Sequence, residues 1–162
     1  MTNTKKFLLA LIPVFIMIGV MVYTGAQAGG DKNLIVKLEL APTIELAKDL
    51  LAPYDEDHLR WLGLNTQLDF VFILTYSVLF FFALNYFLAI SKWKPLAFLA
   101  FVPGLLDVIE NIFILDFLNH DFTTQHFAFY YWCVHIKWGM IPFLVIASLG
   151  LIGLLFYKKV KD

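Results

Sequence analysis

Four long apolar segments dominate the chain, at residues 7–26, 68–90, 96–118 and 129–157. Each is long enough to cross the hydrocarbon core of a bilayer, which is about 30 Å thick and needs roughly 20 helical residues. Backbone N–H and C=O groups find no water in lipid, so these segments are predicted to be helices; none shows the alternation of a membrane-barrel strand. The pattern predicts an all-α membrane protein, a bundle of four transmembrane helices in one membrane domain, residues 1–162.

Residues 27–67, between the first two spans, are predicted to form a small cap over one end of the bundle. Residues 33–41 (NLIVKLELA) alternate with period two, which favours a short strand with one apolar edge. Residues 43–54 (TIELAKDLLAPY) place apolar side chains at helical spacing, with Thr43 as N-cap and Pro53 at the end. The cap is therefore expected to contain one strand and one helix.

The N-terminal segment resembles a secretory signal in outline. Lys5 and Lys6 precede an apolar run, and residues 26–28 read Ala-Gln-Ala, as at a cleavage site. The apolar run is longer than the usual core of a signal peptide, so we expect an uncleaved first membrane helix; cleavage is the alternative.

The positions of the lysines predict the orientation in the membrane. Lys5 and Lys6 precede the first span, Lys92 and Lys94 lie between the second and third, and further lysines follow residue 157. With four spans, all of these lie on one side. The positive-inside rule places this side, and with it both termini, in the cytoplasm, and the cap outside.

Composition supports a membrane protein and excludes some classes of function. The chain is 60% hydrophobic, against about 45–50% for soluble domains. Its net charge of −1 gives no basic surface for nucleic acid. Cys133 is the only cysteine, which rules out an intrachain disulfide and a cysteine-based metal site. Nothing in the sequence indicates the class of a cofactor.

Helix three contains polar side chains where lipid would surround an ordinary span. Relative to Asp107, Glu110 lies about 60° and Asn111 about 40° around the helix axis, so the three share one helix face. An ionisable group in a span costs about 2.5–3.5 kcal/mol on insertion scales, so this face is expected to point into the bundle or toward water.

Polar groups of two other helices lie at matching depths. Asp107 is about 16 Å into its span, near the midplane, and Tyr76 and Lys137 reach a similar level in helices two and four. We expect these groups to meet, with Lys137 compensating the acids. Asp107 and Glu110 would repel, so one of them is expected to hold a proton near neutral pH. Asp107, Glu110, Lys137 and Tyr76 are thus candidate catalytic residues, and Asp69 and Asn111 candidate binding residues.

The alternative is structural. Polar side chains in membrane bundles also hydrogen-bond between helices for about 0.6–2 kcal/mol each, without touching a ligand. No metal site is predicted: His120 and His126, with Asp116 and Asp121, surround a short loop but match no compact ligand spacing.

The order of four motifs resembles a family of small four-span bacterial membrane proteins: ELAPT (39–43), LDFVFILTY (68–76), DVIEN (107–111) and KW (137–138). Members of that family pair an external E-L-A-x-T segment with D-x-x-F-I-x-x-Y, D-x-x-E-N and a late lysine. The resemblance covers about residues 33–145 and implies a bacterial cytoplasmic membrane, but no chemistry. The positions that it marks are Glu39, Thr43, Asp69, Tyr76, Asp107, Glu110, Asn111 and Lys137, with Glu39 and Thr43 as further binding candidates.

Three hypotheses of function follow. The first is a protein that binds or processes a membrane lipid or small amphiphile from the outer leaflet, with acids and lysine in a polar pocket. The second is an accessory or assembly subunit, whose polar residues only hold the bundle and whose partner is a membrane protein or a second copy; small residues in 147–153 suit close helix packing. The third is a proton or ion carrier, which four short spans would support only in an oligomer. We favour the first.

Overall fold

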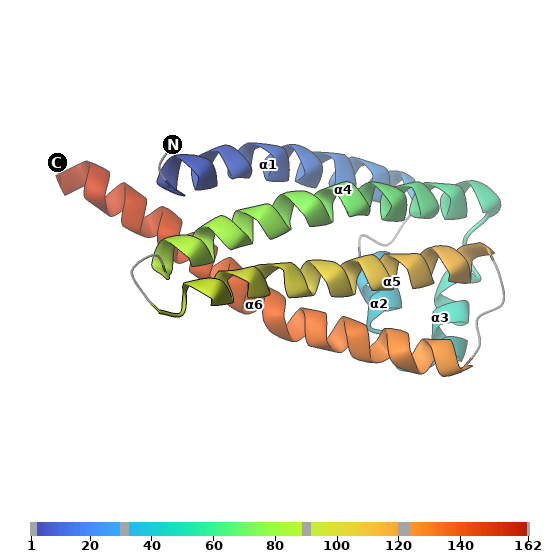
Figure 1. Cartoon of the computed structure of the whole chain (residues 1–162). Helices are drawn as coiled ribbons and strands as arrows, with labels where there is room; N and C mark the ends of the chain where they lie inside the picture. The colour runs from blue at the N-terminus through green and yellow to red at the C-terminus, as the bar shows by residue number, and fades with distance from the viewer. Residues whose placement is uncertain (1–2, 30–32, 89–91, 120–123, 162) are drawn as a thin grey trace.

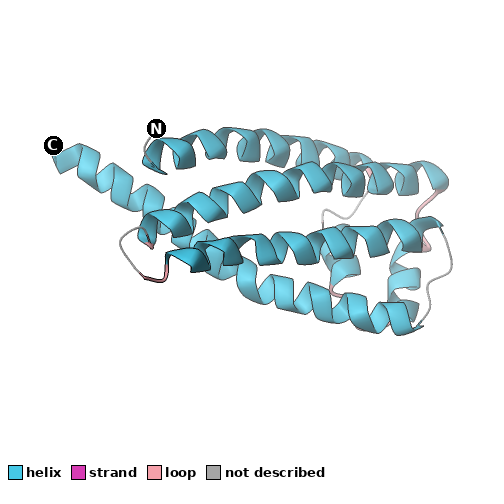
Figure 2. Cartoon of the chain, in the orientation of Figure 1, coloured by secondary structure: helices cyan, strands magenta, loops and turns pink. Residues whose placement is uncertain are grey.

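A computed structural model describes residues 3–29, 33–88, 92–119 and 124–161 (Figure 1). These residues are almost entirely helical, and no strand occurs among them (Figure 2). The elements, in order, are α1 (Asn3–Gln27), α2 (Leu34–Glu39), α3 (Ile44–Leu51), α4 (Glu56–Phe87), the 3-10 helix η1 (Lys94–Ala100), α5 (Phe101–Asn119) and α6 (Thr124–Lys161).

The four predicted membrane spans are confirmed as helices long and apolar enough to cross a bilayer, at Asn3–Gln27, Glu56–Phe87, Lys94–Asn119 and His126–Tyr157. Large apolar side chains such as Phe143 are exposed on their outer faces, as expected where lipid replaces water. Both ends of the described chain lie at one end of the bundle (Figure 1). The protein is therefore a multi-pass membrane protein built as a helical bundle.

The second span begins earlier than predicted, at Glu56 rather than at residue 68. Asp55 is its N-cap, because Asp55 Oδ1 accepts a hydrogen bond from the backbone N–H of His58 at 3.0 Å. That hydrogen bond, with a second one to the His58 ring, holds the pKa of Asp55 below its usual range. Residues 56–67, predicted as part of the cap, are thus the first turns of α4.

The predicted strand at residues 33–41 is wrong, because Leu34–Glu39 form the short helix α2. Leu34 and Leu38 are both buried, and two residues four apart lie on one face of a helix as readily as on one edge of a strand. The predicted helix that follows is confirmed as α3. Its N-cap is Thr43, whose side-chain oxygen accepts from the backbone N–H of Leu46 at 3.2 Å.

Neighbouring helices are joined by close approach and by buried polar contacts. Asn65 of α4 donates to Thr24 Oγ1 of α1 at 2.6 Å and to the Met21 carbonyl at 3.0 Å. Where α4 meets α5, Gly104 lies so near Ser77 that an added Cβ would contact the Ser77 hydroxyl and come within 3.3 Å of Ile73. Glycine is required there by the packing of the two backbones.

We expect Gly104→Val to lower the free energy of unfolding by about 1–3 kcal/mol, because the new side chain would push α4 and α5 apart. Equilibrium unfolding in mixed micelles measures this. Gly19→Val on α1 is the matched control, since a Cβ at Gly19 meets no atom within 4 Å. Equal losses in the two variants would contradict the close approach at Gly104.

Candidate functional site

Lys137 of α6 lies at the centre of the buried polar groups, with only 3% of its side chain exposed. Its Nζ is 2.9 Å from Asp107 Oδ1 and 2.6 Å from Glu110 Oε2, both on α5. A third carboxylate comes from α2, where Glu39 Oε2 lies 3.4 Å from the same nitrogen. One ammonium group therefore joins three helices, and each of its three N–H bonds has a carboxylate within reach.

A second set of hydrogen bonds surrounds this centre. The Tyr76 hydroxyl of α4 donates to Asp107 Oδ2 at 2.7 Å. The Trp138 indole N–H donates to Glu39 Oε2 at 2.9 Å. Asn111 Nδ2 donates to Asp69 Oδ2 at 2.7 Å, which links α5 to α4. Each of these neutral donors is directed at a carboxylate.

The structure brings together most of the residues that the sequence singled out. Thr43 is the exception, because it caps α3 and is exposed. Trp138 was not predicted as a site residue; the only signal was its place beside Lys137 in the motif KW. The residues that share the site, here called the polar cluster, are Glu39, Asp69, Tyr76, Asp107, Glu110, Asn111, Lys137 and Trp138.

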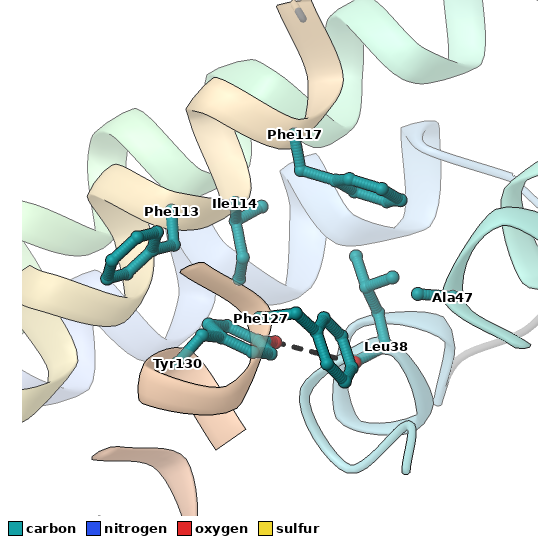
Figure 3. A pocket seen from close by; sticks show the side chains of 7 residues that line it. All are labelled: Leu38, Ala47, Phe113, Ile114, Phe117, Phe127 and Tyr130. Carbon is teal, nitrogen blue, oxygen red and sulfur yellow. Dashed lines mark hydrogen bonds between the residues drawn. The ribbon is translucent and has the colours of Figure 1, made fainter. Parts of the chain in front are cut away.

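Glu39 reaches the polar cluster because its neighbour Leu38 packs α2 against the bundle. Figure 3 shows Leu38 among the side chains of α5 and α6 that it meets. Leu38 packs in an apolar cluster with Ile114 and Tyr130, and the Tyr130 hydroxyl donates to the Leu38 carbonyl at 3.4 Å. The void among these side chains is only about 10 Å³ and its lining is apolar apart from that hydroxyl. It is at most the size of one water and is a feature of packing, not a ligand site.

A much larger pocket of about 510 Å³ adjoins the polar cluster. Its volume falls in the ordinary range for small-molecule sites, about 300–1,000 Å³. Here called the lateral pocket, it lies between α1 and α6, with α4 behind and α2 at one end. The polar cluster contributes Glu39, Asp69, Tyr76, Asp107, Lys137 and Trp138 to its wall.

The rest of the wall is apolar apart from Ser148 and extends from the polar cluster toward the terminal end of the bundle. Leu11 on α1, Phe80 on α4 and Ile152 on α6 line that far part. On the rim, Phe15 is 65% exposed and Leu149 is 61% exposed. Both belong to membrane-spanning helices, so the pocket opens sideways, where the lipid chains would lie.

The two acids of α5 differ in access to this pocket. Asp107 lines it, whereas Glu110 has no exposed surface and does not. Within the described residues, Glu110 is held by its ion pair with Lys137, and neither of its carboxylate oxygens accepts a hydrogen bond. Asp107 can therefore touch a ligand in the lateral pocket, and Glu110 acts on the pocket only through Lys137.

The histidines give no metal centre within the described ranges, where no group of three or more His, Cys, Asp or Glu side chains is arranged to hold an ion. His120 and Asp121 lie outside the described residues. His126 lies beside the ring of Phe113.

Comparison with protein-family models, with curated proteins and with solved structures finds no match to this chain. The resemblance drawn from the four motifs thus stays a prediction.

We expect Lys137→Met to lower the free energy of unfolding by about 3–5 kcal/mol, because it leaves buried carboxylates without a counter-charge. The double variant Lys137→Met, Glu110→Gln should recover part of that loss, since one of the carboxylates becomes a neutral amide. Equilibrium unfolding of the three proteins in one mixed-micelle system measures both effects. A loss of less than about 0.5 kcal/mol in the single variant would contradict the ion-pair arrangement.

Proposed function

We propose that the protein binds a membrane lipid or another amphiphile in the lateral pocket, entering sideways from the bilayer. The apolar chain would lie along α1, α4 and α6, and the head group would meet the polar cluster. The observation that carries this proposal is the continuity of one pocket, apolar along most of its length and polar at one end. A pocket that is apolar along its length and polar at one end matches a molecule with an apolar chain and a polar head group.

Processing of the bound molecule is part of the same proposal. Asp107 is the candidate acid or base, because it lines the pocket and is hydrogen-bonded by both Tyr76 and Lys137. Lys137 would stabilise negative charge on Asp107, and Glu110 would position Lys137. A protein that only binds and holds the amphiphile would need the same pocket but no turnover.

For location, we propose the bacterial cytoplasmic membrane, with both termini in the cytoplasm. The support is the excess of lysine at the ends of the chain and near η1. The polar end of the lateral pocket, beside α2, would then lie toward the outer leaflet.

We expect Ser148→Trp to abolish retention of an amphiphile. Ser148 is a small buried residue on the pocket wall, so an indole there would occupy the space of the apolar chain. Native mass spectrometry from a mild maltoside detergent should show wild type with one discrete bound molecule and the variant without it.

The matched control is Gly150→Trp, two residues away on the same helix, where an added Cβ would meet no atom within 4 Å. This variant should retain the bound molecule. If wild type retains nothing, or all three proteins retain the same molecules, the proposal fails. The polar cluster would then serve to hold the bundle, as in an accessory subunit.

The proposed orientation predicts which introduced cysteines react from outside the cell. In a Cys133→Ala background, Asp49→Cys on α3 should be labelled by a membrane-impermeant maleimide on intact cells. Lys5→Cys, at the start of α1, should be labelled only after the cells are opened. The reverse pattern would invert the orientation, and with it the leaflet from which the pocket is filled.

A further inference from the structure

We infer that the lateral pocket selects an amphiphile with a positively charged amine head group. The inference rests on the proposed function and names the class of molecule that the same site would take. Two features of the pocket wall support it. Its donors already bond to other groups of the protein, and one of its carboxylates has no cation beside it among the described residues.

The donors that the polar cluster brings to the pocket wall are already directed at carboxylates, and the Ser148 hydroxyl donates to the Leu144 carbonyl. The three N–H bonds of Lys137 face Asp107, Glu110 and Glu39. The hydroxyl of Tyr76 and the indole N–H of Trp138 are directed at two of these same acids. A phosphate or carboxylate head group would therefore have to displace an existing bond before it gained one.

Acceptors, in contrast, remain available. The described hydrogen bonds to Glu39 all end on Oε2, and the one to Asp69 ends on Oδ2. A carboxylate has two oxygens, each with two lone pairs, so both residues retain capacity to accept. The pocket wall therefore has free hydrogen-bond acceptors, which a ligand with N–H donors would satisfy.

Asp69 indicates that the head group carries a positive charge. It lines the lateral pocket, and its hydrogen bond within the described residues comes from the neutral amide of Asn111. The ion pairs of Lys137 go to the other three acids, so no described cation pairs with Asp69. A carboxylate in a membrane pocket is stabilised by a positive partner, which an ammonium head group would supply.

Aromatic rings on the same pocket wall as Asp69 suit the same head group. Phe72 and Tyr76 line the pocket with their ring centres 5.4 Å apart, in an edge-to-face arrangement, whereas the Trp138 ring already has Lys137 Nζ at 5.4 Å. Cations are attracted to the faces of such rings when they lie within about 6 Å. Carboxylate and aromatic groups together recognise an amine more strongly than either does alone.

The test compares three probes with one alkyl chain and different heads: dodecylamine, dodecanol and dodecyl phosphate. The full chain is kept in maltoside micelles, and native mass spectrometry gives the fraction with one probe bound. Ser148→Trp serves as the blank for non-specific uptake. We expect wild type to bind dodecylamine at least about tenfold more tightly than the other two, as for one added charge contact.

Asp69→Asn should weaken dodecylamine binding about tenfold and leave dodecanol binding unchanged. Asp49→Asn, the same substitution on the exposed face of α3, should bind all probes as wild type does. If Asp69→Asn does not purify as a folded protein, Glu39→Gln replaces it with the same expectation. The order in which wild type binds the three probes then decides whether the pocket selects amines.

The outcomes separate the two proposals. If dodecanol or dodecyl phosphate binds wild type as tightly as dodecylamine, and Ser148→Trp abolishes this binding, the pocket binds amphiphiles but does not select amines. If no probe binds wild type better than Ser148→Trp, the selection and the proposed function both fail.

Discussion

The contact on which the rest of the structure depends is the ammonium group of Lys137 among three carboxylates. A charge in the hydrocarbon region is tolerated only beside its partner, so Lys137 can take its depth in α6 only where α5 presents Asp107 and Glu110. This fixes how far α6 slides along α5. Glu39 brings α2 to the same point, although α2 is too short to span a membrane. Buried ion pairs add little net stability to the fold, but breaking one is costly. They therefore fix the relative positions of the helices more than they raise the free energy of unfolding.

The lateral pocket follows from which helices are joined. Asn65 ties α4 to Thr24 of α1, and Lys137 ties α6 to α5. These contacts join α1 to α4 and α6 to α5, and α6 runs at an angle to the other helices (Figure 1). The lateral pocket therefore lies between α1 and α6. It opens toward lipid and has the polar cluster at one end. The same contact that sets the register thus also supplies the polar wall of the pocket.

Helical periodicity made much of this predictable from the sequence. Backbone hydrogen bonding forces a helix in lipid, so a rotation of 100° and a rise of about 1.5 Å per residue are enough to bring Asp107, Tyr76 and Lys137 to one depth. Outside the spans that constraint is absent. The apolar residues in 34–39 fit the period of a strand and that of a helix equally well. The contacts of Leu38 with α5 and α6, which are remote in sequence, favour the helix. Trp138 was missed for a related reason, because its partner Glu39 depends on how α2 docks.

Whether the polar cluster is structural or functional is not a choice between two alternatives, because its carboxylates divide by position. Glu110 is fully buried against Lys137 and away from the pocket wall, and such a group can only hold its neighbours in place. Asp107 is bonded within the cluster and also faces the pocket, where the proposed ligand would meet it. Asp69 faces the pocket and accepts the Asn111 hydrogen bond that links α5 to α4, a link that an uncharged acceptor would also make. A cluster needed only as interhelical glue would have no reason to keep a charge-bearing group at that place, and this favours a ligand at the pocket.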